Sequence, residues 1–246
     1  LVVAYVSSVT RVMNNPPQQL HIPVLFADTL ALLNPQPNEH YLDLTAGYGG
    51  HAKGVIARIG TAANATLCDR DAFAIANLAP LKEQGAQLIH SDYLSAAQQL
   101  LEAGKTFDMI LLDLGVSSVQ LDRAERGFSF MHYGPLDMRM DQSQDLTAAT
   151  LVNRYSERYL IDILENYGEM GQREAVKVAR AIVVRRKQQP FTMTADLADV
   201  IRVAIGELDH GKHHKIHPAT RAFQALRIAV NDELGQLERT LPLAVK

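Results

Sequence analysis

The sequence has one cysteine, no internal repeat and no apolar run that reaches the roughly 18 residues of a membrane-spanning helix. A single thiol excludes an intramolecular disulfide, and a cysteine inside an apolar run, such as Cys68, usually packs as inert core. These absences argue against the disulfide-stabilised secreted class and the helical membrane class. They favour a globular protein of the reducing cytoplasm, with no membrane partner.

A strong net charge is also absent, since the 246 residues carry a formal net charge of −3. The charge is nevertheless uneven, because residues 170–227 hold 11 Lys and Arg against 5 Asp and Glu, a net +6, and the remainder carries −9. In this basic segment Arg173, Lys177 and Arg180 recur on one face of a predicted helix, and Arg185 follows. Such a face is usually only solvated, and its alternative role is contact with nucleic-acid phosphates.

Residues 1–19 match neither a folded element nor a signal peptide. The opening "LVVAYVSSVTRV" lacks a basic first segment and a convincing cleavage site, and Met13 precedes the polar, proline-rich "NNPPQQL". We therefore expect residues 1–19 to be a disordered or non-native extension.

Four short apolar runs in the first half each carry an aspartate at or near their end. They span residues 40–45, 65–70, 86–92 and 107–115. Helix-like stretches between them close at Gly60, Gly85 and Gly104, which are typical helix stops. This alternation predicts an α/β fold with a doubly wound, Rossmann-like parallel sheet, in which ligands bind beyond the carboxyl ends of the strands.

The second half loses this alternation. Residues 121–217 combine a long loop with helical stretches, and we expect them to form an all-helical insert. From His217 to Leu241, apolar residues recur every three or four positions, which predicts one long amphipathic helix. We expect that helix to return to the α/β domain, made of residues 20–120 and 218–246.

The stretch "GYGGHA" fits the dinucleotide-binding fingerprint, with Gly47 and Gly49 at the required offsets and Asp69 about twenty residues further on. Taken alone this match is weak, because a pyrophosphate bound there would be repelled by nearby carboxylates. The predicted strand ends supply four of them: Asp43, Asp69, Asp92 and Asp113. An acidic edge of this kind favours a cationic ligand, although any single aspartate is more often a turn former.

S-adenosylmethionine matches these requirements, because it carries a sulfonium and an ammonium but no phosphate. Glycines let the backbone approach it closely, as at Gly47. Asp69 can accept both ribose hydroxyls, Asp43 can lie near the ammonium, and Tyr93 can cover the adenine. Cytosine C5 methylation is disfavoured, because it needs a thiol nucleophile and Cys68 lies inside a predicted strand.

Several blocks resemble a known family. In order they are "HIPVL", "TAGYGGHAKGV", "CDRDAFAI", "LLDLGVSSVQLDRAERGFSF", "GPLDMRMD", "ENYGE" and "HPATRAFQALRIAVNDEL". They are similar to blocks of the bacterial small-subunit ribosomal RNA N4-cytosine methyltransferases, the MraW family, over residues 20–245. The family's pattern continues into further strands and a "SFHSLEDR" block that this chain lacks, so we expect a C-terminal truncation.

The resemblance implies methyl transfer from S-adenosylmethionine to a cytosine amine in the decoding region of the small-subunit RNA. The partner is that RNA or the assembled subunit, and a homodimer is left open. The cofactor contacts that it implies are Gly49, Gly50, His51, Asp69, Tyr93, Asp113 and Gln120. Asp113, at the end of the fourth predicted strand, is our candidate catalytic acceptor of an amine proton.

The predicted substrate contacts lie in the second half. Phe128, Phe130 and Arg139 belong to a loop that we expect to stack on the base, or alternatively to anchor itself to the core. Arg180 and Arg185 are candidate phosphate contacts, and Arg221 faces the site from the long helix in this prediction.

Two other functions are kept as alternatives: a nicotinamide-dependent oxidoreductase that uses the glycine-rich loop, and a catalytically crippled RNA-binding fragment. The histidine-rich stretch around His214 does not have metal-ligand spacing, so we predict no metal site.

Overall fold

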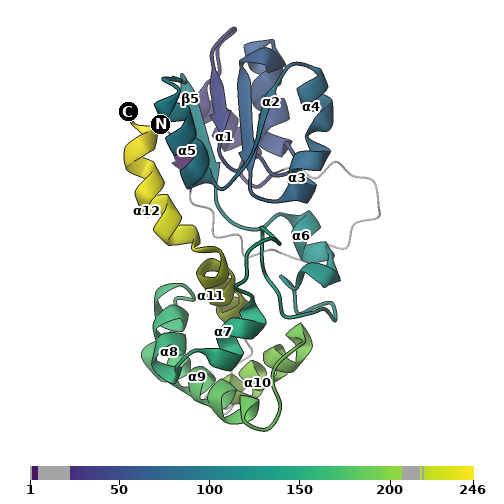
Figure 1. Cartoon of the computed structure of the whole chain (residues 1–246), viewed down its shortest axis with the longest axis vertical. Coiled ribbons are helices and arrows are strands. Elements are labelled where there is room, and N and C mark those ends of the chain that lie inside the picture. Colours follow the sequence, from purple (N-terminus) through teal and green to yellow (C-terminus); the bar gives the residue numbers. More distant parts are fainter. Residues whose placement is uncertain (1, 5–22, 207–216, 218) are drawn as a thin grey trace. The chain divides into compact units, whose positions relative to one another are not determined.

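The computed structural model describes residues 2–4, 23–206, 217 and 219–246, and the chain divides into two compact units (Figure 1). The first unit consists of Leu1–Gly115 and Leu234–Lys246, and the second of Val116–Glu233. Both boundaries differ from the expected ones, after residues 120 and 217. The second boundary differs more, because the helix that follows residue 218 packs in the core of the second unit.

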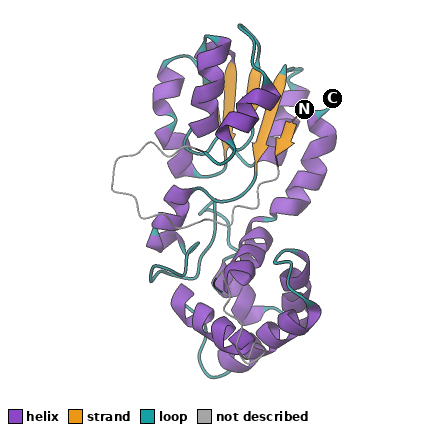
Figure 2. Ribbon diagram, turned by 180° about the vertical axis from the view of Figure 1, so that it is seen from behind, coloured by secondary structure: helices purple, strands orange, loops and turns teal. Residues whose placement is uncertain are grey.

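The first unit is built on a parallel sheet, drawn in orange in Figure 2. Its strand order is β1-β5-β2-β3-β4. Its strands are β1 (Val2–Ala4), β2 (Tyr41–Asp43), β3 (Ala65–Asp69), β4 (Gln87–His90) and β5 (Met109–Asp113). The connecting helices are α2 (Gly50–Ile59), α3 (Ala72–Asn77), α4 (Ala79–Glu83) and α5 (Tyr93–Glu102), with the 3₁₀ turn η1 (Ala62–Asn64). The predicted α/β fold is confirmed.

Helices cover both faces of this sheet, because successive strand residues point to opposite sides. Leu111 packs with α1 (Phe26–Leu33), α2 and α4, whereas Leu112 packs with α5 and α12 (Glu233–Ala244). Cys68 lies in the second of these layers, and burial raises the pKa of its thiol. This position agrees with the prediction of an inert core cysteine and not with a nucleophile.

The expected disorder of residues 1–19 is wrong for β1. Val2–Ala4 pair in parallel with β5, with Val3 opposite Leu112. Two β-branched residues suit a strand, and an edge of β5 without a neighbour would leave its backbone groups unpaired. The other residues of that extension, 1 and 5–19, lie outside the described ranges.

The second unit is helical. It contains α6 (Ser118–Asp122), η2 (Ala124–Arg126), α7 (Ala148–Arg154), α8 (Glu157–Asn166), α9 (Gln172–Arg186), α10 (Thr194–Gly206) and α11 (Ala219–Asn231). Its helices share one apolar core, which includes Leu151, Ile182 and Phe223. In neither unit is any described helix both long and apolar enough to span a membrane.

The single long helix expected over residues 217–241 is instead two helices. α11 ends at Asn231 and α12 begins at Glu233, because Asp232 adopts a left-handed conformation with φ of 47°. Asn231, the last residue of α11, donates its side-chain amide N–H groups to the Met138 carbonyl (2.8 Å) and to the Arg227 carbonyl (2.9 Å). The spacing of apolar residues at every third or fourth position continues through this break, so the sequence pattern does not reveal it.

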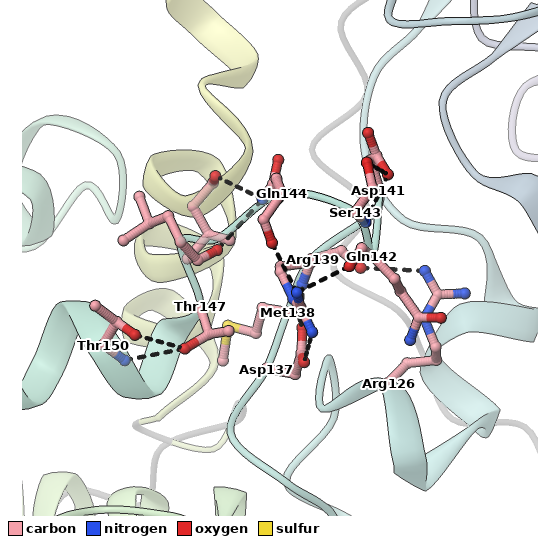
Figure 3. Close-up of polar contacts among 12 residues, drawn as sticks. Arg126, Asp137, Met138, Arg139, Asp141, Gln142, Ser143, Gln144, Thr147 and Thr150 are labelled. Carbon is pink, nitrogen blue, oxygen red and sulfur yellow. Dashed lines mark hydrogen bonds and ion pairs between the residues drawn. The ribbon is translucent and has the colours of Figure 1, made fainter.

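The segment before α7 is an ordered loop held by its own polar groups (Figure 3). Arg139 donates to both carboxylate oxygens of Asp137 (2.8 Å each) and to the carbonyls of Gln142 and Gln144. Arg126, which is 1% exposed, donates to the carbonyls of Arg139 and Met140. These bonds give the loop one defined shape.

Gly127 tests how tightly this loop is closed. It has a φ of 71°, and an added Cβ would lie 2.1 Å from the Pro135 carbonyl oxygen. We therefore expect Gly127→Ala to lower the free energy of unfolding in urea by about 2 kcal/mol or more. Gly171→Ala is the control, because no atom lies within 4 Å of its Cβ position. Equal stability of the two variants would contradict this packing.

Candidate cofactor site at the carboxyl edge of the sheet

Four aspartates stand at or just past the carboxyl ends of neighbouring strands. The strands β5, β2, β3 and β4 are consecutive in the sheet, and they lead to Asp113, Asp43, Asp69 and Asp92. The sequence order of the strands reverses between β2 and β5, which is where ligands bind in doubly wound sheets. The four side chains therefore start from the edge at which a ligand is expected.

Asp43 is almost fully buried, with 1% of its surface exposed. Its carboxylate accepts hydrogen bonds from the Tyr41 hydroxyl (2.8 Å) and from the Thr45 backbone N–H (3.1 Å). Burial raises the pKa of Asp43 from 3.8 to about 7, against the lowering effect of both donors. At neutral pH this carboxyl is close to half ionised, and a cation beside it would favour the ionised form.

Asp69 ties the glycine-rich turn to the end of β3. Its Oδ2 accepts from the Gly47 N–H (2.7 Å), and its Oδ1 accepts from the Asp71 N–H (2.8 Å). Burial raises the pKa of Asp69, whereas these two backbone donors lower it. Each carboxylate oxygen has a second lone pair, so both retain acceptor capacity for hydroxyl groups.

The glycines of the turn are needed for two different reasons. A Cβ on Gly49 would meet Leu78 Cδ2 at 2.9 Å, and one on Gly50 would meet Pro23 Cγ at 2.4 Å. These two positions are thus already restricted by the protein's own packing. Gly47 has a φ of 51°, and the nearest atom to its Cβ position is the Thr45 carbonyl oxygen at 3.9 Å, so a ligand can approach the backbone there.

His51 and Asp113 face each other. His51 lies in the first turn of α2 and is 7% exposed, and its Nε2 is 3.5 Å from Asp113 Oδ2. The Asp113 side chain is 33% exposed. Its backbone N–H donates to Thr45 Oγ1 (2.7 Å), which ties the end of β5 to the turn that follows β2. Asp113 is therefore a partly accessible carboxylate on a fixed backbone.

Asp92 and Tyr93 have structural roles that the sequence pattern did not reveal. Asp92 caps α5, since its carboxylate accepts from the Ser95 N–H and Ser95 hydroxyl (2.9 Å each). Tyr93 is 5% exposed and packs with Cys68 and Leu112 in the core beneath the sheet. Its burial favours packing over the predicted contact with adenine, which stays untested.

Gln120 and the loop aromatics belong to the second unit. Gln120 completes a capping box, in which its Oε1 accepts from the Ser117 N–H (3.0 Å). Phe128 is buried in the helical core. Phe130 packs against the rings of His217 (4.6 Å between centroids) and Phe223 (4.9 Å). These contacts agree with the anchoring alternative that was set beside base stacking.

The four arginines predicted to contact the substrate differ in how many contacts they make with other side chains of the protein. Arg139 is tied to Asp137 inside the loop, and Arg221 pairs with Glu174 (2.5 Å). Arg185 lies over the Phe191 ring (5.1 Å). Arg180 is the most accessible of the four, with 68% of its side chain exposed.

His210, His213 and His214 lie outside the described residues. The structure therefore does not test the prediction that this histidine-rich stretch holds no metal.

Sequence reasoning missed Tyr41 and Thr45. Tyr41 precedes Asp43 by two positions, and residues two apart in a strand lie on the same face, so this contact had a readable signal. Thr45 joins Asp43 to Asp113 through its backbone N–H and its hydroxyl. Its role depends on the neighbouring strand, which local sequence does not show.

The raised pKa of Asp43 predicts a specific pH dependence of stability. Between about pH 4 and pH 7 the folded protein keeps a proton that the unfolded chain has released, so this group's stabilisation falls as pH rises through about 7. Relative to Asp43→Asn, the native chain should lose about 2 kcal/mol of unfolding free energy between pH 5 and pH 8 in urea titrations. The exposed Asp28→Asn variant should keep the native pH dependence, and an unchanged slope in Asp43→Asn would contradict the assignment.

Residues 18–246 match the MraW methylase family. Three similar proteins are each named ribosomal RNA small subunit methyltransferase H. That of Stenotrophomonas maltophilia strain K279a is 45% identical over 230 residues, which cover 92% of this chain and 69% of the relative. The protein of Synechocystis is 46% identical over 233 residues, which cover 91% of this chain and 72% of the relative. The protein of Nitrosomonas eutropha is 41% identical over 228 residues, which cover 92% of this chain and 71% of the relative. With a family match of this extent, the chain belongs to the MraW methylase family.

Proposed function

We propose that this chain transfers a methyl group from S-adenosylmethionine to the exocyclic N4 amine of a cytosine in the decoding region of small-subunit ribosomal RNA, in the cytoplasm. Family membership and the names of the relatives support RNA methylation. The observation that carries the proposal is the carboxylate edge of the first unit, where Asp43, Asp69 and Asp113 follow three adjacent strands.

The residues of this edge fit a cationic nucleoside. Asp43 is a buried carboxyl whose pKa of about 7 leaves it ready to ionise beside an ammonium. Asp69 keeps lone pairs for two ribose hydroxyls, and Gly47 leaves room at its Cα. S-adenosylmethionine, when bound, would supply a methyl group attached to a positively charged sulfur, and that sulfur would become a neutral thioether when the methyl group is transferred.

Asp113 is the proposed acceptor of the amine proton. The lone pair of the cytosine amine is delocalised into the ring, so the nitrogen needs alignment and a base that withdraws its proton. The carboxylate of Asp113 is partly exposed at the end of β5, next to β2, and can reach an incoming group. As the new N–C bond forms, the nitrogen loses one proton to this carboxylate.

The helical unit is the proposed RNA-contacting part. A paired base cannot reach a protein pocket, so the target must be unpaired or flipped. Arg173 and Arg180 are exposed on α9, and such a basic face can follow the phosphate backbone. Phe128 and Phe130 are less suited to stacking than was predicted, because both pack in the helical core.

The two alternatives are less well supported. An oxidoreductase would place a pyrophosphate beside Asp43, Asp69 and Asp113, and the family match favours a methylase. A non-catalytic RNA-binding fragment would retain RNA without modifying it, and the test below separates this outcome from the proposal.

The proposal predicts that methyl transfer depends on Asp113. We expect Asp113→Asn to lower the rate of tritiated methyl incorporation into isolated small ribosomal subunits by about 100-fold or more, because the amide cannot take up the proton. Asp108→Asn, which changes a carboxylate with 52% of its side chain exposed, is the matched control and should retain activity.

Three outcomes are distinct. Incorporation that persists in Asp113→Asn would contradict the role of this carboxylate but not the activity. RNA retention without incorporation by the unaltered chain would contradict the activity and support the fragment alternative. Incorporation at a position other than a cytosine N4 would contradict the assigned substrate atom.

The proposed phosphate contacts predict a change in salt dependence. Arg180→Gln should weaken RNA binding for all sequences and reduce the slope of log K against log salt by about 0.7 to 0.9, the contribution of one phosphate contact. Arg158→Gln is the control, because Arg158 is also an exposed arginine paired with a carboxylate. Equal slopes for the two variants in filter-binding titrations would remove α9 from the RNA interface.

A further inference from the structure

His51 is a buried imidazole placed against the proposed proton acceptor. Its Nε2 lies 3.5 Å from Asp113 Oδ2, and its side chain is 8% exposed. Its ring stacks on Phe26, with 5.9 Å between centroids and an interplanar angle of 27°. Held between an aromatic ring and a carboxylate, the imidazole has little freedom to rotate.

The two ring nitrogens differ in their surroundings. His51 Nδ1 is buried, and within the described parts of the chain it has no hydrogen-bond partner. A proton on Nδ1 would therefore be a buried donor without an acceptor, whereas a proton on Nε2 points at Asp113. Of the two neutral tautomers, this arrangement favours the one with its proton on Nε2.

The Asp113 carboxylate needs such a neighbour. Its backbone is fixed through Thr45, but the side chain is one-third exposed and can rotate about its Cα–Cβ bond. A donor beside Oδ2 selects one orientation and leaves Oδ1 for an incoming N–H. The separation of 3.5 Å is longer than a strong hydrogen bond, and such contacts commonly shorten when the substrate complex forms.

We propose that His51 is a positioning residue for Asp113: its Nε2–H holds Oδ2, so that Oδ1 faces the amine whose proton it accepts. This inference rests on the proposed function, and it differs from the cofactor contact that the family resemblance implies for the same histidine. The two roles predict different kinetic effects.

His51→Leu and His51→Gln separate these roles, because glutamine retains an N–H donor near the position of Nε2. We expect His51→Leu to lower kcat by about 10- to 100-fold, with the Kd for S-adenosylmethionine changed less than about threefold. His51→Gln should recover most of that loss. His40→Leu is the control, because His40 also faces an aspartate, Asp108, at 3.8 Å but is exposed.

The opposite pattern would overturn the inference. A Kd for S-adenosylmethionine that rises tenfold or more in His51→Leu, with kcat unchanged, would assign His51 to the cofactor. Failure of His51→Gln to recover kcat, when its circular dichroism and melting temperature match those of the unaltered chain, would also count against positioning.

A second measurement does not depend on activity. Nitrogen-15 NMR of the unaltered chain should show the His51 proton on Nε2, and Asp113→Ala should change the tautomer population and the Nε2 shift. A proton on Nδ1 would overturn the inference whether or not the chain is active. An Nε2 proton in a chain that incorporates no methyl group would leave this pair in place and overturn the proposed function alone.

Discussion

The site depends on the parallel direction of its strands, which brings several carboxylates to one edge of the sheet. Asp43, Asp69 and Asp113 follow adjacent strands, and their charges would repel one another if all three were ionised without compensation. The protein meets this constraint with local donors: Tyr41 and Thr45 for Asp43, and the Gly47 and Asp71 N–H groups for Asp69. Burial still outweighs those donors, since the pKa of both carboxyls is raised. A positive charge at this edge would therefore favour the ionised form of both carboxyls.

The division of labour among the four aspartates follows from their partners. Asp92 is satisfied by the first turn of α5 and serves that helix. Asp43 is held by the Tyr41 hydroxyl and the Thr45 N–H, and Asp69 by two backbone N–H groups, so both carboxylates have fixed orientations. Asp113 keeps an accessible carboxylate beside a buried histidine, which suits proton transfer. One secondary-structure pattern thus yields a helix cap at Asp92 and three carboxylates to which we assign binding and proton transfer as proposals.

Much of the first unit could be predicted from sequence, because strand and helix periods and glycine stops are local signals. The strands ending near Asp43, Asp69 and Asp113 are confirmed, as is the helix end at Gly60, which has a φ of 85°. Features set by distant contacts were missed. The break at Asp232 is accompanied by bonds from Asn231 to a loop about 90 residues earlier in the chain, and β1 forms because β5 offers an edge.

Individual site residues were harder to predict than the elements that carry them. Sequence gives the position of a side chain along a strand or helix, but not what it packs against. Tyr93 was assigned to a ligand and lies in the core, and Arg139 was assigned to RNA and binds Asp137. Both are chemically suited to the predicted role, which stays a prediction, and sequence alone did not show the tertiary contacts that they make.

The proposed preference of this edge for a cation is tested most directly by proton-linked calorimetry at pH 7. Because the pKa of Asp43 is about 7, a bound ammonium or sulfonium should lower it and release part of a proton. Titration with S-adenosylmethionine in buffers of different ionisation enthalpy should show this release, and Asp43→Asn should abolish it. Proton uptake, or binding of NADH in place of S-adenosylmethionine, would contradict the account.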